Sequence, residues 1–264
     1  MFMSLRTSIE NILRDFGKIS LAEIQKASLL RRRDSKFIFS VDKVPAILSD
    51  LESEYRVLEI EGKYIHSYQT TYYDTDDLKM YHKHHRGMVN RHKIRFRKYN
   101  TSNIVFLEVK LKDSRGVTTK NRMKAENGEN VILSKEEEFL NSYTPFKNEE
   151  INPVLENSFN RITLVHHGQK ERITLDYKLE FSKPGKKDLL EIPGIAIAEI
   201  KYEEKLADSL FVKCLRNNHI HPRRFSKYCT GMAMLNPDLK QNLFKMRVRE
   251  VNKINNAYKE KFNN

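Results

Sequence analysis

Several short segments of the chain alternate hydrophobic with charged residues, a period of two that is typical of β-strands with one apolar face. In residues 91–97, four basic residues occupy alternate positions, and His92, Ile94 and Phe96 occupy the positions between them. Because successive side chains of a strand point to opposite faces, one face of this segment is cationic. Residues 104–112 and 117–124 repeat the arrangement. The pattern therefore predicts three consecutive strands whose charged faces are mainly positive.

Strand-like and helical segments alternate through the rest of the chain. Turn residues at 100–103 and 114–116 leave only short connections between the central strands, which favours antiparallel hairpins. Helices are predicted where apolar residues recur at helical spacing: up to residue 30 and over 44–51, 134–140, 206–215 and 238–258. Further strands are predicted over 31–40, 65–74, 160–165, 171–179, 195–202 and 224–234. The predicted fold class is α+β, mainly antiparallel β.

Strands that are polar on one face and apolar on the other can form an open sheet with its charges in water. They can also close into a barrel with the charges inside and with helices covering the apolar outer face. Repetition of the pattern across strands favours the barrel. No break in composition divides residues 31–236, so we predict one domain there. An N-terminal helical segment at 1–30 and a basic C-terminal helix at 237–264 would flank it.

The composition indicates what such a protein binds. The chain has 264 residues, and its 48 basic against 35 acidic residues give a net charge of +13, which favours polyanionic partners. Nucleic acid, an anionic membrane surface and polyphosphate all fit this charge. Cys214 and Cys229 are far apart, and neither a signal-peptide pattern nor an apolar stretch of ~20 residues is present. We therefore expect a cytoplasmic protein that does not itself span a membrane.

Three acidic residues lie among the charged strand positions. They are Glu108, Asp176 and Glu199. Each is either an ion-pair partner for neighbouring lysines and arginines or a ligand for a hard divalent cation such as Mg²⁺ or Mn²⁺. Such an ion binds oxygen ligands and bridges to phosphates.

Ordered motifs across residues 31–236 resemble the VTC domain, the polyphosphate polymerase branch of the triphosphate tunnel metalloenzymes. The motifs of the first half are Asp34-Ser-Lys36-Phe, Tyr72-Tyr-Asp74-Thr, Tyr81-His-Lys-His-His-Arg-Gly87, Arg91-x-Lys-x-Arg95-x-Arg97 and Leu107-Glu108-Val-Lys110-x-Lys-x-x-x-Gly116-x-Thr-x-Lys120-x-Arg122. Those of the second half are Phe159-Asn-Arg161, Arg172-Ile-Thr-Leu-Asp176, Glu199-Ile-Lys201 and Phe225-Ser226-Lys227-Tyr-x-x-Gly231. The resemblance implies an eight-stranded antiparallel triphosphate tunnel with covering helices.

The resemblance also implies an activity, namely ATP-dependent polyphosphate synthesis that transfers the γ-phosphate of ATP to a growing chain with Mn²⁺ or Mg²⁺. ATP and polyphosphate would be the ligands. A membrane-protein partner is a further expectation, because related polymerases work in membrane complexes. The Glu-x-Glu-x-Lys signature of the related triphosphate hydrolases is absent near Lys36, which favours the polymerase branch.

The resemblance and the cationic strand faces together predict the site residues. The residues expected to be catalytic are Arg95, Arg97, Lys110, Arg161 and Lys227. Those expected to bind phosphate are Lys36, Arg91, Lys93, Lys120, Arg122, Lys201, Arg224 and Ser226, and those expected to bind metal are Glu199 and Glu108. Two positions depart from the family pattern: Arg224 stands where a lysine is favoured, and Phe159 stands where a tyrosine is usual.

Other functions stay open at this point. An inorganic or nucleoside triphosphatase would use the same tunnel with water as the acceptor. A noncatalytic module would bind polyphosphate or inositol phosphates without turnover. Nucleic acid is not expected as the main ligand, because neither a recognition helix nor an aromatic stacking set is apparent. His82, His84 and His85 have no further ligand nearby at a spacing that zinc would need, and we expect them in a polar turn.

Overall fold

Eight strands form one antiparallel sheet in the computed structural model, which describes residues 4–26, 33–168, 170–203 and 205–262. Along the sheet they follow the order β2–β10–β9–β8–β4–β5–β6–β7. Their bounds in chain order are β2 (Arg33–Ser40), β4 (His66–Thr75), β5 (Arg91–Tyr99), β6 (Ile104–Lys112), β7 (Thr118–Lys124), β8 (Ile151–His166), β9 (Glu171–Ser182) and β10 (Leu190–Tyr202). The antiparallel fold class and the eight strands of the predicted tunnel are thus confirmed, within a sheet of ten strands.

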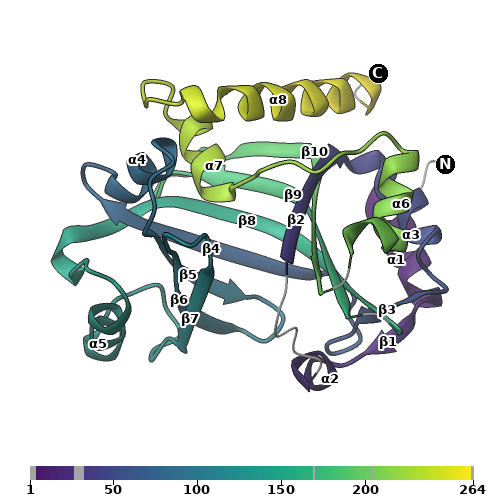
Figure 1. Ribbon diagram of the computed structural model, residues 1–264, viewed down its shortest axis with the longest axis horizontal. Coiled ribbons are helices and arrows are strands. Elements are labelled where there is room, and N and C mark those ends of the chain that lie inside the picture. The colour runs from purple at the N-terminus through teal and green to yellow at the C-terminus, as the bar shows by residue number, and fades with distance from the viewer. Residues whose placement is uncertain (1–3, 27–32, 169, 204, 263–264) are drawn as a thin grey trace.

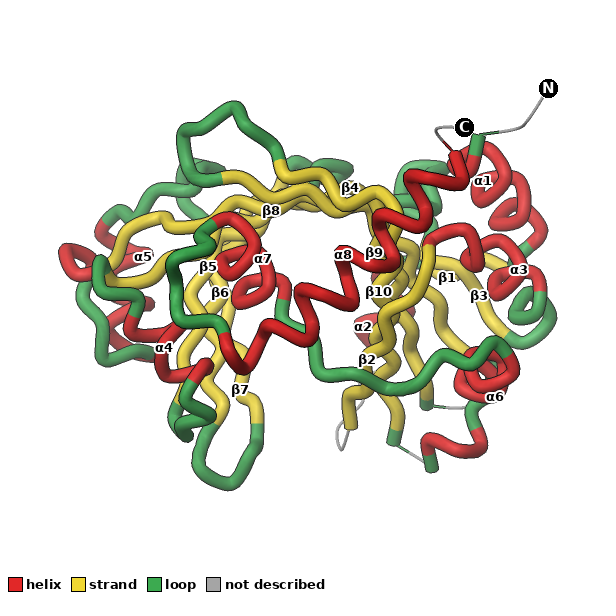
Figure 2. Tube along the Cα trace, turned by 90° about the horizontal axis from the view of Figure 1, so that it is seen from above, coloured by secondary structure: helices red, strands yellow, loops and turns green. Residues whose placement is uncertain are grey.

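Among the described residues the sheet bends into an arch and is not closed by main-chain hydrogen bonds, so the predicted closure into a complete barrel is not found there. Seen from above, β5 to β7 form one flank, β4 and β8 cross between the flanks, and β9, β10 and β2 form the other (Figure 2). Within the residues that the structure describes, the outermost strands β2 and β7 do not pair with each other. Two short strands extend the sheet beside β8: β3 (Tyr55–Leu58) pairs with it, and β1 (Gly17–Ile19) pairs with β3. Neither short strand was predicted.

The register brings the predicted cationic positions into rows that cross the strands. Lys93, Lys110 and Lys120 lie directly opposite one another on β5, β6 and β7. In the next row, Glu108 lies between Arg95 and Arg122. Since directly opposed side chains share one face of a sheet, these rows form a single charged surface.

Helices cover the opposite face, as the alternation predicts. Near the central hairpins, α5 (Ser134–Tyr143) packs on Ile94, Phe96 and Leu107, which alternate with the charged residues. At the other flank, α1 (Leu5–Asp15), α3 (Val44–Ser49) and α6 (Leu210–Asn217) share a core with β2, β9 and β10 (Figure 1). The short helix α2 (Leu21–Lys26) precedes β2.

The C-terminal helix α8 (Asn242–Phe262) confirms the helix predicted there. It crosses β10, where Asn255 Oδ1 accepts the N–H of Gly194 at 2.9 Å. A Cβ atom at residue 194 would lie 2.6 Å from Cβ of Tyr258, so only glycine permits this close approach. The predicted domain boundary between residues 30 and 31 lies outside the described residues, and the division into 1–30, 31–236 and 237–264 stays a prediction.

The strand predicted over 224–234 is wrong, because these residues form the helix α7 (Lys227–Leu235). The Oγ atom of Ser226 accepts the N–H of Cys229 at 3.2 Å and caps the first turn. Six consecutive residues from 228 to 233 are buried, so the helix shows no amphipathic period in the sequence. It packs on the charged side of the sheet, where Tyr228 stacks on Tyr72 at 5.2 Å.

The predicted histidine turn is also wrong, since residues 79–85 form the helix α4 (Lys79–His85). Asp74, fully buried at the end of β4, accepts the N–H groups of Met80 and Tyr81 at 2.9 Å each. The hydroxyl of Tyr228 donates to the same carboxylate. One buried side chain therefore fixes α4 and α7 relative to β4.

Candidate functional site

Glu108 is buried beneath the charged surface, and two basic side chains contact its carboxylate. Its side chain is 0% exposed, its Oε2 accepts from Nε of Arg95 at 2.8 Å, and its Oε1 accepts from Lys120. Burial alone raises the pKa of Glu108, but the charges of Arg95, Arg97 and Lys120 outweigh it and hold the pKa well below its usual value. The carboxylate is therefore ionised and orients both cations.

Asp176 repeats this arrangement on β9. Its two oxygens accept from Nε and NH2 of Arg161 at 2.6 and 2.8 Å, and Lys227 of α7 also donates to it. Burial raises the pKa of Asp176, yet the charges of Arg161 and then Lys227 lower it to about 2. Asp176 was not among the predicted catalytic, phosphate-binding or metal-binding residues, although its position on the charged strand face pointed to it. It joins two predicted catalytic residues that lie 66 positions apart in the chain.

Glu199 is the third carboxylate with two cations. Lys36 lies 3.0 Å from its Oε2, and Lys201 donates to its Oε1 at 2.8 Å. Burial raises the pKa of Glu199, but Lys36 and then Lys201 hold it well below the usual value. Unlike Glu108, the Glu199 side chain is 21% exposed, so solvent reaches it.

Three further basic residues make no ion pair with a carboxylate among the described residues. Lys93 donates to Oγ of Ser226 at 3.0 Å, and the buried Arg97 donates from Nε to Oγ1 of Thr70 at 3.2 Å. For Lys110, the charge of Arg95 and then burial hold the pKa well below its usual value. The three carboxylates thus leave the surface strongly positive. A ligand with several negative charges would neutralise it.

Phe159 is a contact partner whose role the sequence did not reveal. Its ring is 2% exposed and lies 4.2 Å from Nζ of Lys227, 5.2 Å from Cζ of Arg161 and 5.6 Å from Cζ of Arg97. An aromatic face attracts cations without neutralising them. Phe159 therefore contacts three predicted catalytic residues without itself neutralising their charge. Its spacing of two from Arg161, on one strand face, was the signal in the sequence.

The remaining predicted residues lie at the margin of this cluster. Arg122 stacks over the ring of Phe106, with Cζ 4.8 Å from the ring centroid. Arg91 is half-buried at the start of β5, and Arg224 is exposed in the segment before α7. Neither Arg91 nor Arg224 makes an ion pair within the described ranges, so their phosphate-binding roles stay predictions.

His84 belongs to the packing of α4 against α7. Its Nδ1 lies 2.9 Å from Sγ of Cys229. Burial, with nearby Lys93 and Arg91, lowers the pKa of His84 to about 3, so the imidazole is neutral at physiological pH. It contributes no positive charge to the cluster.

The donor groups fit a divalent cation at Glu199 better than at Glu108. The described residues contain no group of three or more His, Cys, Asp or Glu side chains that could hold an ion alone. Mg²⁺ commonly takes one or two carboxylates and completes its shell with water and phosphate oxygens. Both carboxylates are engaged by two basic side chains, but Glu199 is 21% exposed and can be reached by such an ion, whereas Glu108 is 0% exposed.

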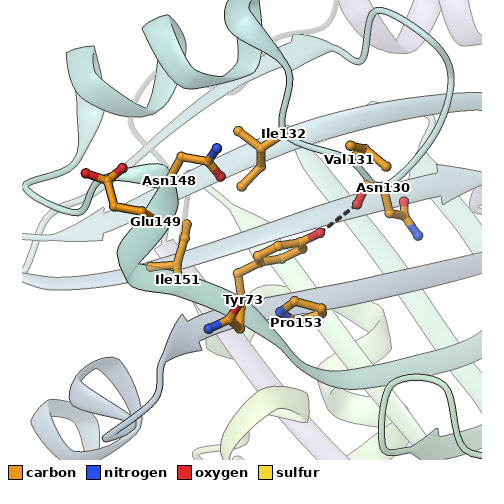
Figure 3. A pocket seen from close by; sticks show the side chains of 9 residues that line it. Tyr73, Asn130, Val131, Ile132, Asn148, Glu149, Ile151 and Pro153 are labelled. Atoms are coloured by element: carbon orange, nitrogen blue, oxygen red, sulfur yellow. Dashed lines mark hydrogen bonds between the residues drawn. The ribbon is translucent and has the colours of Figure 1, made fainter.

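The charged surface is separate from a pocket of about 330 Å³ on the opposite side of the sheet (Figure 3). Tyr73 lies in the middle of this pocket and donates its hydroxyl to the carbonyl of Asn130 at 2.6 Å. The lining contains Glu149 and no basic residue. The pocket is therefore unsuited to an anionic ligand, and it contains none of the predicted site residues.

An arched antiparallel sheet with an excess of basic side chains on its inner face is the architecture of a tunnel fold (Figure 2). The family model of the VTC domain matches residues 31–236. The chain therefore belongs to the VTC domain family, and the resemblance seen in the sequence motifs is confirmed.

Comparisons with solved structures find similar arrangements at low sequence identity. A candidate adenylate cyclase from Bacillus halodurans is 15% identical, with 74% of this chain and 94% of that chain covered and a TM-score of 0.45. A candidate adenylyl cyclase from Hippeastrum, described as having a dominant triphosphatase activity, is 13% identical, with 76% and 94% covered and a TM-score of 0.49. No curated protein matches the chain.

The Asp176 cluster predicts how stability responds to acid. The pKa of Asp176 is depressed to about 2 in the folded protein from 3.8, so its contribution is present above about pH 4 and is lost as the pH falls toward 2. We expect wild type to exceed Asp176→Asn in free energy of unfolding at pH about 5, and the difference to shrink at pH about 3. Urea unfolding of both proteins at each pH measures this. A difference that stays constant with pH would contradict the ionised pairing with Arg161 and Lys227.

Proposed function

We propose that this protein is an ATP-dependent polyphosphate polymerase that transfers the γ-phosphate of ATP to a growing polyphosphate chain. The observation that carries the proposal is the excess of basic side chains on the inner face of the arched sheet (Figure 2), with Arg97 and Lys110 free of carboxylate ion pairs within the described residues. Membership of the VTC domain family supports a phosphoryl-transfer enzyme of the tunnel type.

Phosphoryl transfer requires positioning and charge neutralisation more than covalent help from the protein. The terminal phosphate of the acceptor chain attacks the γ-phosphorus in line, a new P–O bond forms, and the bond to the bridging oxygen breaks. ADP leaves with that electron pair. Arg97, Lys110 and Lys227 bind the phosphate oxygens and stabilise the charge that is redistributed in the transition state. A divalent ion at Glu199 would add further neutralisation of phosphate charge.

The carboxylates favour a phosphate acceptor over water. Two basic side chains bind each of the carboxylates Glu108, Asp176 and Glu199 and together contact both of its oxygens. These three groups are therefore poorly placed to take a proton from water. An acceptor phosphate is already ionised and needs no such base. Hydrolysis in the same tunnel therefore has weaker support than polymer synthesis.

The product separates the alternatives directly. We expect purified protein incubated with ATP and Mn²⁺ or Mg²⁺ to yield a ladder of polyphosphate on a gel, together with ADP. Orthophosphate without polymer would identify a triphosphatase instead. Binding of tripolyphosphate without any turnover would identify a noncatalytic module. Omission of the metal ion is the matched control, because Glu199 is proposed to hold it.

The cellular setting stays a prediction. No helix in the described ranges is both long and apolar enough to cross a membrane. A membrane-protein partner and a cytoplasmic location are consistent with the proposed activity. Co-purification of the protein from its native membranes would test the partner.

A further inference from the structure

Four aromatic side chains form a continuous row across four neighbouring strands at one end of the charged surface. Phe159 stacks on Tyr68 with the ring planes 3° apart and the centroids 5.4 Å apart. Tyr68 meets Tyr99 at 4.9 Å, and Tyr99 meets Phe106 at 5.6 Å. Phe106 lies directly opposite Arg97, and Tyr99 follows Arg97 by two positions on β5. The row therefore shares a face with the predicted phosphate-binding residues.

Burial changes along this row. Phe159 and Tyr68 are 2% and 7% exposed and lie under Arg97 and Arg161, so their rings are occupied by holding cations. Tyr99 and Phe106 are only partly buried. Phe106 belongs to none of the hydrophobic clusters found among the described residues. Its ring is thus not used for packing a core, and Arg122 lies over it at 4.8 Å.

The spacing suits the nucleoside end of a nucleoside triphosphate. Two residues of a strand advance about 7 Å, so the Cα atom of Tyr99 lies about that far beyond the Cα atom of Arg97 along β5. A ribose places a base at a comparable distance from its phosphates. If the phosphates lie on Arg97 and Lys110, the base reaches the partly exposed end of the aromatic row. Guanidinium planes and aromatic rings both stack on nucleobases.

We propose that Tyr99, Phe106 and Arg122 form a stacking site for the nucleobase of the phosphate donor. This inference rests on the proposed function, since it names the donor as a nucleoside triphosphate and gives it a direction in the tunnel. Stacking tolerates different bases, so the site selects nucleotides over inorganic tripolyphosphate more than it selects one base. Neither a core role nor a phosphate-binding role requires an aromatic ring at residue 106.

The test compares ATP with inorganic tripolyphosphate by isothermal titration calorimetry, with Mg²⁺ present throughout. The variants are Phe106→Leu and Tyr99→Leu, which keep an apolar side chain and remove the ring. We expect each to bind ATP about tenfold more weakly and tripolyphosphate within about twofold of wild type. Tyr143→Leu is the matched control, because Tyr143 is an exposed aromatic on α5 at the opposite face, and its affinities should equal those of wild type.

Every result decides the inference. Equal weakening for ATP and tripolyphosphate would assign the two rings to the shape of the tunnel and overturn the stacking site. Unchanged ATP binding in both variants would overturn it as well. If wild type binds tripolyphosphate but not ATP, the stacking site fails while the phosphate-binding tunnel stands. If wild type binds neither ligand, the proposed function itself fails.

Discussion

A Lys110→Met variant is expected to bind tripolyphosphate about tenfold to a hundredfold more weakly than wild type, and to unfold at the same temperature or a higher one. The loss of affinity follows from removing one charged hydrogen bond, worth about 1.5–3 kcal/mol. The gain in stability follows because Lys110 lies close to the charge of Arg95 and makes no ion pair in the described part of the chain. Removing its charge relieves repulsion in the unliganded protein.

Calorimetry and thermal unfolding of the same preparations measure the two effects. Lys98→Met is the matched control, since residue 98 lies on β5 but alternates to the other face from Arg97. It removes the same charge from the chain and should leave tripolyphosphate affinity close to that of wild type. Equal weakening in both variants would mean that net charge, rather than the tunnel, determines binding. A clear loss of stability in Lys110→Met would contradict the repulsion.

Unlike Lys110→Met, the variant Arg95→Met is expected to be less stable than wild type, with a loss of about 3–5 kcal/mol in the free energy of unfolding. The cause is Glu108, whose buried carboxylate would keep only Lys120 as an ion-pair partner. Urea unfolding measures the loss. Catalysis in this variant would fall too, but part of that fall would reflect a disturbed fold.

A double variant separates the contribution of the Arg95–Glu108 ion pair from other effects of the substitution. Arg95→Met with Glu108→Gln removes the buried carboxylate that has lost one of its two partners, so it should recover part of the stability lost in Arg95→Met alone. A cost of less than about 1 kcal/mol for Arg95→Met would show that Glu108 is solvated in solution. In that case the buried pairing is wrong. Because Lys110→Met is expected to keep its stability and Arg95→Met is not, Lys110 is the better residue for testing function.

The central hairpins could be predicted from sequence because alternation is a local property. The seven residues from Arg91 to Arg97 are enough to show which side chains share a face of the strand. The short turns then indicate that consecutive strands pair as antiparallel hairpins. The same reasoning failed for α7, because its residues 228–233 are all buried and their hydrophobicity follows neither the strand period of two nor the helical period of about 3.6. It failed for α4 because this helix is stabilised at its first turn by the buried Asp74, which accepts the N–H groups of Met80 and Tyr81. The local pattern of hydrophobic residues does not reveal such a contact.

The candidate site was only partly predictable for a related reason. Sequence patterns identified most of the basic side chains, but they could not pair carboxylates with cations that lie on distant strands. The contact of Asp176 with Lys227 depends on where α7 packs, and that helix was predicted as a strand. The sequence marked Phe159 only as a departure from the family pattern, whereas the position of its ring beside three cations became apparent only when the strands were placed side by side.

If the protein makes polyphosphate as proposed, the unpaired margins of β2 and β7 bear on how a long product leaves it. In a fully hydrogen-bonded cylinder, a polymer longer than the bore must thread out lengthwise or break the main-chain ladder. Here the described part of the seam is not joined by main-chain hydrogen bonds, so separating β2 from β7 would break no hydrogen bond of the sheet. Lateral release of a long chain then requires no unfolding of the sheet.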